Sequence, residues 1–215
     1  MSNATNLINS LRQRGIVDER VLAAIAAVDR ARFVAADLAD QAWEDRALPI
    51  GSEQTISQPY IVALMTEALA LTGNETVLEI GTGSGYQAAI LAKLCARVVT
   101  IERHADLLVP AREVLAALGI DNISYRVGDG TLGAAELAPF DGILVTAGAP
   151  DVPDVLVRQL AENGRMVIPV GDEHAQELVV IRRTATGLDR EYLCDCRFVP
   201  LIGEAGWPAG DVEDG

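Results

Sequence analysis

The chain has 215 residues, half of them hydrophobic, which is enough apolar material for one domain with a three-layer core. A formal net charge of −14 without any basic cluster makes the surface repel phosphate backbones, so nucleic acid is not an expected partner. Three cysteines do not suffice for a disulfide framework, and no signal peptide or membrane-length apolar run is visible, so we expect a cytoplasmic protein without membrane contact.

Residues 5 to about 45 have helical periodicity. Leu7, Ile8 and Leu11 fall on one helical face, and Asp18 can cap a second helix that carries further apolar residues at core spacing. This pattern predicts a helical segment that packs on the rest of the domain.

Residues 46–60, RALPIGSEQTISQPY, contain two prolines and several small polar residues, which predicts a non-repetitive segment. Because the segment precedes the glycine-rich unit described below, it can lie across a cofactor crevice as a lid over the active site. Thr55 and Ser57 carry short hydroxyls suited to an anionic group. They can equally cap the helix expected at 61–71, and the residues alone leave both interpretations open.

From residue 76 onward, strands and helices alternate with short links, which predicts a three-layer, doubly wound and mostly parallel α/β sheet within a single domain. The last two strands are separated by a hairpin-like turn and form an expected antiparallel pair. The cofactor-binding core would span 61–202, and the tail at 203–215, rich in glycine and acid, is expected to be disordered. The expected strands are 76–80, 97–101, 123–127, 141–146, 164–169, 177–183 and 190–199, and the expected helices are 86–95, 105–118 and 152–161.

The stretch VLEIGTGSGYQ at 77–87 passes from an apolar strand through Gly81, Gly83 and Gly85 into a helical pattern. Glycines let a ligand approach bare backbone, and the following helix start favours a polar or negative group. Read from Gly83, the stretch also satisfies the looser dinucleotide pattern G-x-G-x-x-A, so the glycines alone leave nicotinamide and flavin cofactors open.

Acidic residues favour S-adenosylmethionine over those cofactors. Glu79 within the strand completes E-x-G-x-G-x-G, the pattern of class I methyltransferases, and a carboxylate at a buried edge suits an ammonium and a sulfonium. Glu102 ends the next apolar run, where it can accept both ribose hydroxyls, although NAD folds use the same device. Asp129 follows the third strand and can accept from an adenine amino group or simply close a tight turn. Cys194 and Cys196 lack a second Cys or His pair, so no metal is expected.

Together these motifs resemble the protein-L-isoaspartate O-methyltransferase family, over residues 7 to 202. The segment QTIS at 54–57 combined with RFVPL at 197–201 is more specific than the glycine loop. The resemblance implies a Rossmann-like enzyme that transfers a methyl group from S-adenosyl-L-methionine to the free carboxylate of L-isoaspartyl residues in damaged proteins or peptides. S-adenosyl-L-homocysteine is the implied product, and the ester would start repair through a succinimide.

The resemblance also assigns roles to residues. Ser57 would hold the acceptor carboxylate and Thr55 would help to close the pocket. The methionine end of the cofactor falls to Glu79, Gly81, Gly83 and Gly85, the ribose to Glu102, the adenine to Asp129 and Gly130, and a further contact to Gln176.

Three positions depart from the family pattern: Tyr60 stands where many relatives have histidine, Ser52 and Glu53 replace small residues, and Gly148 adds flexibility to TAGAP. Glu53 could shift the substrate preference or simply point to water. Two alternatives therefore stay open: a specialised member acting on one dedicated peptide, and a silent fold that only binds partners. A monomer is expected.

Overall fold

The computed structural model describes residues 3–210. Its centre is a seven-stranded sheet with the order β5-β4-β3-β6-β7-β8-β9, in which β3 to β7 run parallel and β8 and β9 are antiparallel. The expected mostly parallel sheet with a C-terminal antiparallel pair is therefore confirmed. The strands are β3 (Thr76–Ile80), β4 (Arg97–Glu102), β5 (Ile123–Val127), β6 (Phe140–Val145), β7 (Leu160–Gly171), β8 (Gln176–Thr184) and β9 (Gly187–Cys196).

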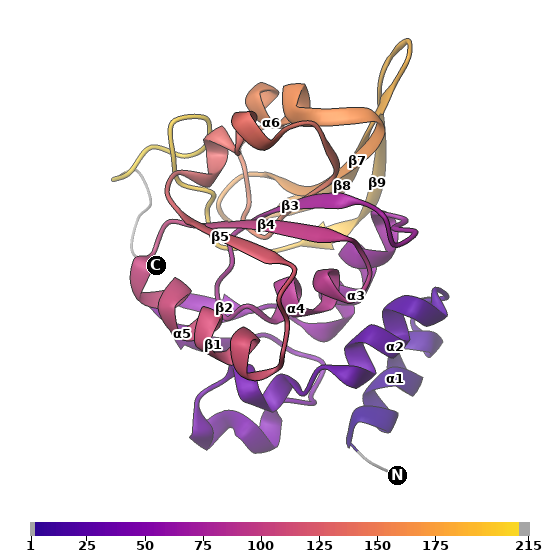
Figure 1. Cartoon of the computed structure of the whole chain (residues 1–215), viewed down its shortest axis with the longest axis vertical. Helices are drawn as coiled ribbons and strands as arrows, with labels where there is room; N and C mark the ends of the chain where they lie inside the picture. Colours follow the sequence, from indigo (N-terminus) through magenta and orange to yellow (C-terminus); the bar gives the residue numbers. More distant parts are fainter. Residues whose placement is uncertain (1–2, 211–215) are drawn as a thin grey trace.

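Helices cover both faces of this sheet (Figure 1). On one face lie α3 (Pro59–Ala68), α4 (Tyr86–Ala92) and α5 (Ala105–Ala117), and on the other lies α6 (Asp154–Gln159). The helix expected at 152–161 is shorter than predicted because β7 already begins at Leu160. Short 3₁₀ turns complete the helical part: η1 (Arg30–Phe33), η2 (Ala36–Gln41), η3 (Gly130–Leu132) and η4 (Ala135–Leu137).

Alternation along the strands divides the core between the two faces. Val77 and Val98 belong to the cluster under α3, α4 and α5, whereas Leu78 and Val99 belong to the cluster that contains Leu156 of α6. All four of these strand residues are fully buried. The central parallel strands are thus apolar on both sides, as helices on two faces require.

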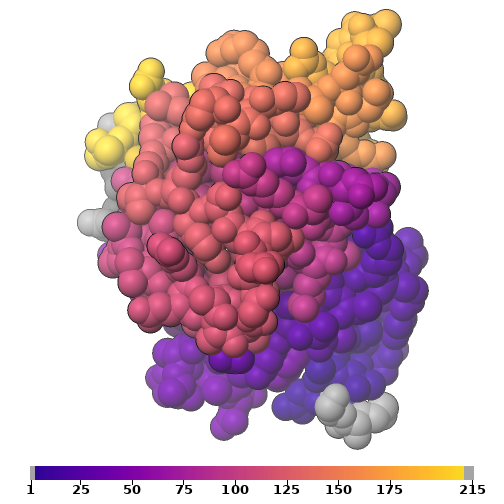
Figure 2. Space-filling view, in the orientation of Figure 1, coloured from indigo at the N-terminus to yellow at the C-terminus, as the bar shows by residue number. Residues whose placement is uncertain are grey.

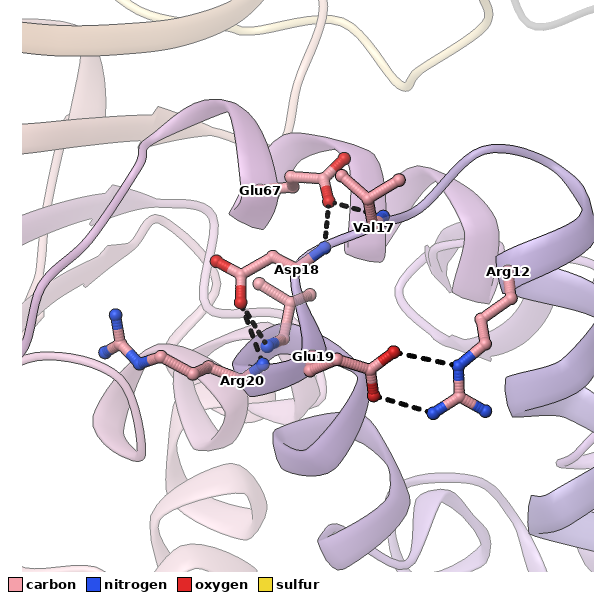
Figure 3. Close-up of polar contacts among 7 residues, drawn as sticks. Arg12, Val17, Asp18, Glu19, Arg20 and Glu67 are labelled. Carbon is pink, nitrogen blue, oxygen red and sulfur yellow. Dashed lines mark hydrogen bonds and ion pairs between the residues drawn. The ribbon is translucent and has the colours of Figure 1, made fainter.

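The N-terminal segment is a pair of helices, α1 (Asn3–Gln13) and α2 (Glu19–Ala27), that packs outside α3 and forms the lower right of the face seen in Figure 2. Asp18 caps α2 as predicted, since its side chain accepts from the backbone N–H groups of Arg20 and Val21. Glu67 of α3 accepts from the N–H groups of Val17 and Asp18 at 2.8 and 2.6 Å (Figure 3). This carboxylate fixes the α1–α2 turn to the core.

Residues 46–60 are not the non-repetitive segment that the sequence predicts. They contain a short antiparallel hairpin, β1 (Leu48–Gly51) and β2 (Gln54–Ile56), whose inward residues Leu48 and Ile56 pair and are buried. Ser52 and Glu53 at the tip both have positive φ, as the type I′ form of a two-residue hairpin turn requires. The prediction fails because Pro49 and Gly51, residue types that usually break regular structure, are compatible with a short edge strand.

The expectation of a disordered tail is wrong for the first part of 203–215. The Trp207 indole N–H donates to the carbonyl of Gly148 at 3.0 Å, and the Glu204 N–H donates to Asp129. Long-range hydrogen bonds from several residues therefore order a segment whose composition alone indicates disorder. Residues 211–215 lie outside the described residues.

Candidate active site

A cavity of about 690 Å³ lies at the carboxyl ends of β3, β4 and β6. This is the edge where ligands bind in open α/β sheets, because the strand order reverses on either side of β3. The hairpin segment 45–58 and the segment 195–202 contribute its other walls. Among the site residues predicted from sequence, Thr55, Ser57, Gly81, Gly83, Glu102 and Gly130 line the cavity, whereas Glu79, Gly85, Asp129 and Gln176 do not.

The glycine loop is shaped by close packing as well as by the cavity. Gly81 has φ +93°, and a Cβ added there would lie 2.3 Å from Oγ1 of Thr146. That hydroxyl lies 2.9 and 2.8 Å from the carbonyl oxygens of Ile80 and Gly81, so it ties the end of β3 to the loop after β6. Gly85 (φ +88°) faces Leu115 of α5, where a Cβ would be crowded, and it is absent from the cavity lining; its predicted cofactor contact stays a prediction.

Glu102 lies where the sequence places it, at the end of β4 and on the cavity wall. Its Oε2 accepts from the Gly83 N–H at 2.8 Å, and its Oε1 accepts from the His104 N–H at 2.9 Å. These two bonds fix the carboxylate and leave lone pairs on both oxygens. The arrangement fits the paired hydroxyls of a ribose.

Glu79 does not reach the cavity directly, contrary to the prediction. Its side chain is fully buried, its Oε2 accepts from the Thr100 hydroxyl at 2.5 Å, and its Oε1 has no hydrogen-bond partner among the described residues. Burial raises its pKa to about 8; the Thr100 hydrogen bond opposes this rise and the nearby Glu102 adds to it. The Thr82 hydroxyl lies 2.6 Å from that of Thr100 and lines the cavity, so two hydroxyls connect Glu79 to the site.

Asp129 and Gln176 also differ from their predicted positions. The carboxylate of Asp129 accepts from the Thr131 N–H and hydroxyl and from the Glu204 N–H, so it holds the C-terminal segment beside the cavity. These bonds offset burial and keep the pKa of Asp129 low. Gln176 accepts from the N–H of Phe198, which lines the cavity. Asp129 and Gln176 therefore contact neighbouring segments and do not line the cavity themselves. Gly130, which follows Asp129, does line the cavity.

Thr55 and Ser57 lie on the cavity wall formed by the hairpin segment. The helix cap interpretation is wrong for both, because α3 begins at Pro59 with Gln58 at its N-cap and no side-chain cap bond. Neither hydroxyl bonds another residue between 3 and 210, and both residues line the cavity. The Ser57 carbonyl accepts from the guanidinium of Arg30 at 3.1 Å. Two hydroxyls are thus available to a ligand.

Sequence reasoning missed three residues of this site. Thr82 and Thr146 provide wall hydroxyls, and the letter T within GTGSG and TAGAP was the available signal. No sequence signal points to Arg30, because the three carbonyls that it binds lie 12, 16 and 27 residues away along the chain.

Between residues 3 and 210, no group of three or more His, Cys, Asp or Glu is placed to hold a metal ion. Over the same range, no helix combines the length and apolarity needed to cross a membrane.

Solved structures resemble this fold over nearly its whole length. A protein-L-isoaspartate O-methyltransferase superimposes with TM-score 0.85 at 29% identity, covering 94% of this chain and 67% of that one. A structure described as the corresponding Plasmodium falciparum protein, in complex with S-adenosyl-L-homocysteine, gives TM-score 0.81 at 28% identity and covers 94% and 99%. Fold and site together define a Rossmann-like, S-adenosylmethionine-dependent methyltransferase.

Sequence comparisons define the family within that class. Residues 2–206 match the family described as Protein-L-isoaspartate(D-aspartate) O-methyltransferase. The chain is 60% identical over 195 residues to the Trichlorobacter lovleyi enzyme of that name, covering 90% of each, and 55% identical over 200 residues to the Syntrophus aciditrophicus enzyme, covering 92% of each. The chain therefore belongs to the protein-L-isoaspartate(D-aspartate) O-methyltransferase family. The enzyme class, the cofactor and the isoaspartyl activity expected from the sequence are confirmed.

Proposed function

We propose that this chain methylates isoaspartyl residues in many damaged proteins, with Ser57 holding the acceptor carboxylate and the opposite wall holding the cofactor. The observation that supports this assignment is that the unpaired hydroxyls of Thr55 and Ser57 line the same cavity as the glycine loop and Glu102. Because the hydroxyls that would hold the acceptor are short and recognise only its carboxylate, they suit a chain segment of variable sequence better than one dedicated peptide.

Cofactor binding is assigned to the backbone of Gly81 and Gly83, to Glu102 for the ribose hydroxyls, and to Gly130 beside the adenine. The site fits such a group, because the Glu102 carboxylate is already oriented by two N–H donors and the backbone of Gly81, Gly83 and Gly130 lines the cavity. S-adenosylmethionine, when bound, supplies an electrophilic methyl group on its sulfonium sulfur. Glu79 would act on its positive end through Thr100 and Thr82.

The protein's chemical task is positioning. A carboxylate with a pKa near 4 is already ionised at neutral pH, so its oxygen can form the new C–O bond without a general base. Ser57 would donate a hydrogen bond to one acceptor oxygen and leave the other directed at the methyl carbon. The hairpin β1–β2 and the segment 195–202 would exclude water from the reacting atoms.

Oligomeric state and location are part of the same proposal. We infer a cytoplasmic monomer, supported by three free cysteines and by exposed large hydrophobic residues that are scattered over different elements: Val17, Val109, Val127, Leu132, Leu188 and Tyr192. Light scattering of the purified chain tests the monomer.

A pair of peptides tests the function. An isoaspartyl peptide and its aspartyl twin, each given labelled S-adenosylmethionine, should differ by orders of magnitude in methyl incorporation. Several isoaspartyl peptides of unrelated sequence should all be accepted. Cofactor binding by calorimetry with methylation of one sequence alone would favour the dedicated enzyme, and binding without methylation of any would favour the silent fold.

A further inference from the structure

Arg30 is a buried cation that the assigned mechanism does not use. It is the first residue of η1, and its side chain has no exposed surface. Its Nη1 donates to the Ala42 carbonyl at 2.5 Å, and its Nη2 donates to the carbonyls of Arg46 and Ser57 at 3.0 and 3.1 Å. One guanidinium therefore joins the end of η2, the start of the hairpin segment and the serine of the acceptor wall.

This cation has no carboxylate partner. The ion pairs among residues 3–210 do not include Arg30. The negative charge of Asp45 raises the pKa of Arg30, but the Asp45 carboxylate itself pairs with Arg14 and accepts from the Tyr60 N–H. Burial lowers its pKa, but an arginine side chain stays protonated in proteins. A buried charge neutralised only by carbonyl dipoles is costly.

Arg30 lies directly behind the cavity wall. It is absent from the lining itself, but Arg46 and Ser57, whose carbonyls it holds, both line the cavity. Tyr86, another lining residue, lies beneath it with the ring centre 5.7 Å from the guanidinium carbon. Since Tyr86 begins α4 directly after the glycine loop, the positive charge lies behind the cavity and close to both Ser57 and the end of the glycine loop.

We propose that Arg30 is a positioning residue that fixes the backbone of Ser57 and makes the acceptor site selective for an anionic group. The interior around the guanidinium screens its charge poorly, so a carboxylate at Ser57 is attracted more strongly than a neutral amide or ester would be. Methylation removes the negative charge of the acceptor, so the ester product loses this attraction and leaves. The inference rests on the proposed function of Ser57 and deepens it.

The test compares binding of an isoaspartyl peptide with that of its neutral isoasparaginyl analogue, in the presence of S-adenosylhomocysteine. Wild type should prefer the anionic peptide by about tenfold or more. Arg30→Gln should lose most of that preference, with the KM for the isoaspartyl peptide raised about tenfold and cofactor affinity changed less than about threefold. Arg30→Lys, which keeps the charge but not the three-carbonyl geometry, should retain the preference while lowering kcat.

Arg20 offers the matched control. Its guanidinium also donates to backbone carbonyls, those of Leu71 and Leu94, and joins α2 to the core away from the cavity. Arg20→Gln should leave both the peptide preference and the KM unchanged. Equal loss of preference in Arg20→Gln and Arg30→Gln, or an unchanged preference in Arg30→Gln, overturns the inference.

A second measurement does not depend on the folding of Arg30 variants. Ser57→Ala removes the hydroxyl but keeps the carbonyl and the buried cation, so it should still bind the anionic peptide in preference to the neutral one. If Ser57→Ala abolishes the preference, the charge of Arg30 does not supply it. A wild type that methylates no isoaspartyl peptide contradicts the proposed function, whereas a methylating wild type with an unaffected Arg30→Gln contradicts only the role of Arg30.

Discussion

The Thr100 hydroxyl donates a 2.5 Å hydrogen bond to Oε2 of Glu79 inside the sheet, where the two residues are partners on neighbouring parallel strands. Glu79 is fully buried, and its pKa is raised to about 8 mainly by burial. The ordinary pKa of a glutamate, 4.5, applies to Glu79 in the unfolded state. Between pH 4.5 and pH 8, the folded state therefore holds a proton on Glu79 that the unfolded state has released. The contribution of Glu79 to stability is greatest below pH 4.5 and falls as the pH rises through this window.

Glu79→Gln should remove this dependence while keeping an acceptor for Thr100. Without cofactor, the free energy of unfolding of the variant relative to wild type should rise with pH by on the order of 1 kcal/mol per pH unit across the window, then level off above pH 8. Urea unfolding of both proteins at pH 5, 6, 7, 8 and 9 measures the difference. A difference that stays constant over this range would show that Glu79 is ionised throughout.

Sequence patterns predict the parts of this molecule that depend on neighbours in the chain. The bounds of β3, the glycine turn and the position of Glu102 follow from a short apolar run, three glycines and one residue at a strand end. The patterns do not predict contacts between distant segments. Asp129 and Gln176 are directed away from the cavity by the Glu204 and Phe198 N–H groups, 75 and 22 residues further along.

Ser57→Ala tests the proposed acceptor contact. Loss of one positioning hydrogen bond to a charged group should lower kcat/KM by about ten- to a hundredfold. The affinity for S-adenosylhomocysteine should stay within about twofold of wild type, because Gly83 and Glu102 lie on the opposite wall. Thr55→Ala serves as the neighbouring control and should have a smaller effect. Equal methyl transfer by wild type and Ser57→Ala would remove the serine from the mechanism.

Glu67→Ala tests how the N-terminal helices are attached. Oε1 of Glu67 accepts both the Val17 and the Asp18 N–H, so truncation should lower the free energy of unfolding by about 1–2 kcal/mol. Glu67→Gln keeps an oxygen acceptor and should lose less than half of that amount. Denaturant unfolding of the three proteins compares them, and equal stabilities of wild type and Glu67→Ala would mean that water replaces the carboxylate without cost.

Trp207 tests whether the ordered tail supports the site. Its indole N–H donates to Gly148, and Gly148 in turn exchanges backbone hydrogen bonds with Val199 and Leu201. Because Ala147, Val199 and Leu201 line the cavity, loosening this arrangement should weaken cofactor binding as well as stability.

Trp207→Phe removes the N–H donor and part of the ring but keeps an aromatic side chain, and it should cost about 1 kcal/mol of stability or slightly more, with a correspondingly small loss of affinity for S-adenosylhomocysteine. Trp207→Ala also removes the ring and should cost about 2–3 kcal/mol and raise the dissociation constant by about tenfold. Thermal unfolding and calorimetry on the same samples separate the two effects. If Trp207→Ala loses stability but binds the cofactor as wild type does, the tail is a structural clasp whose order does not reach the cavity wall.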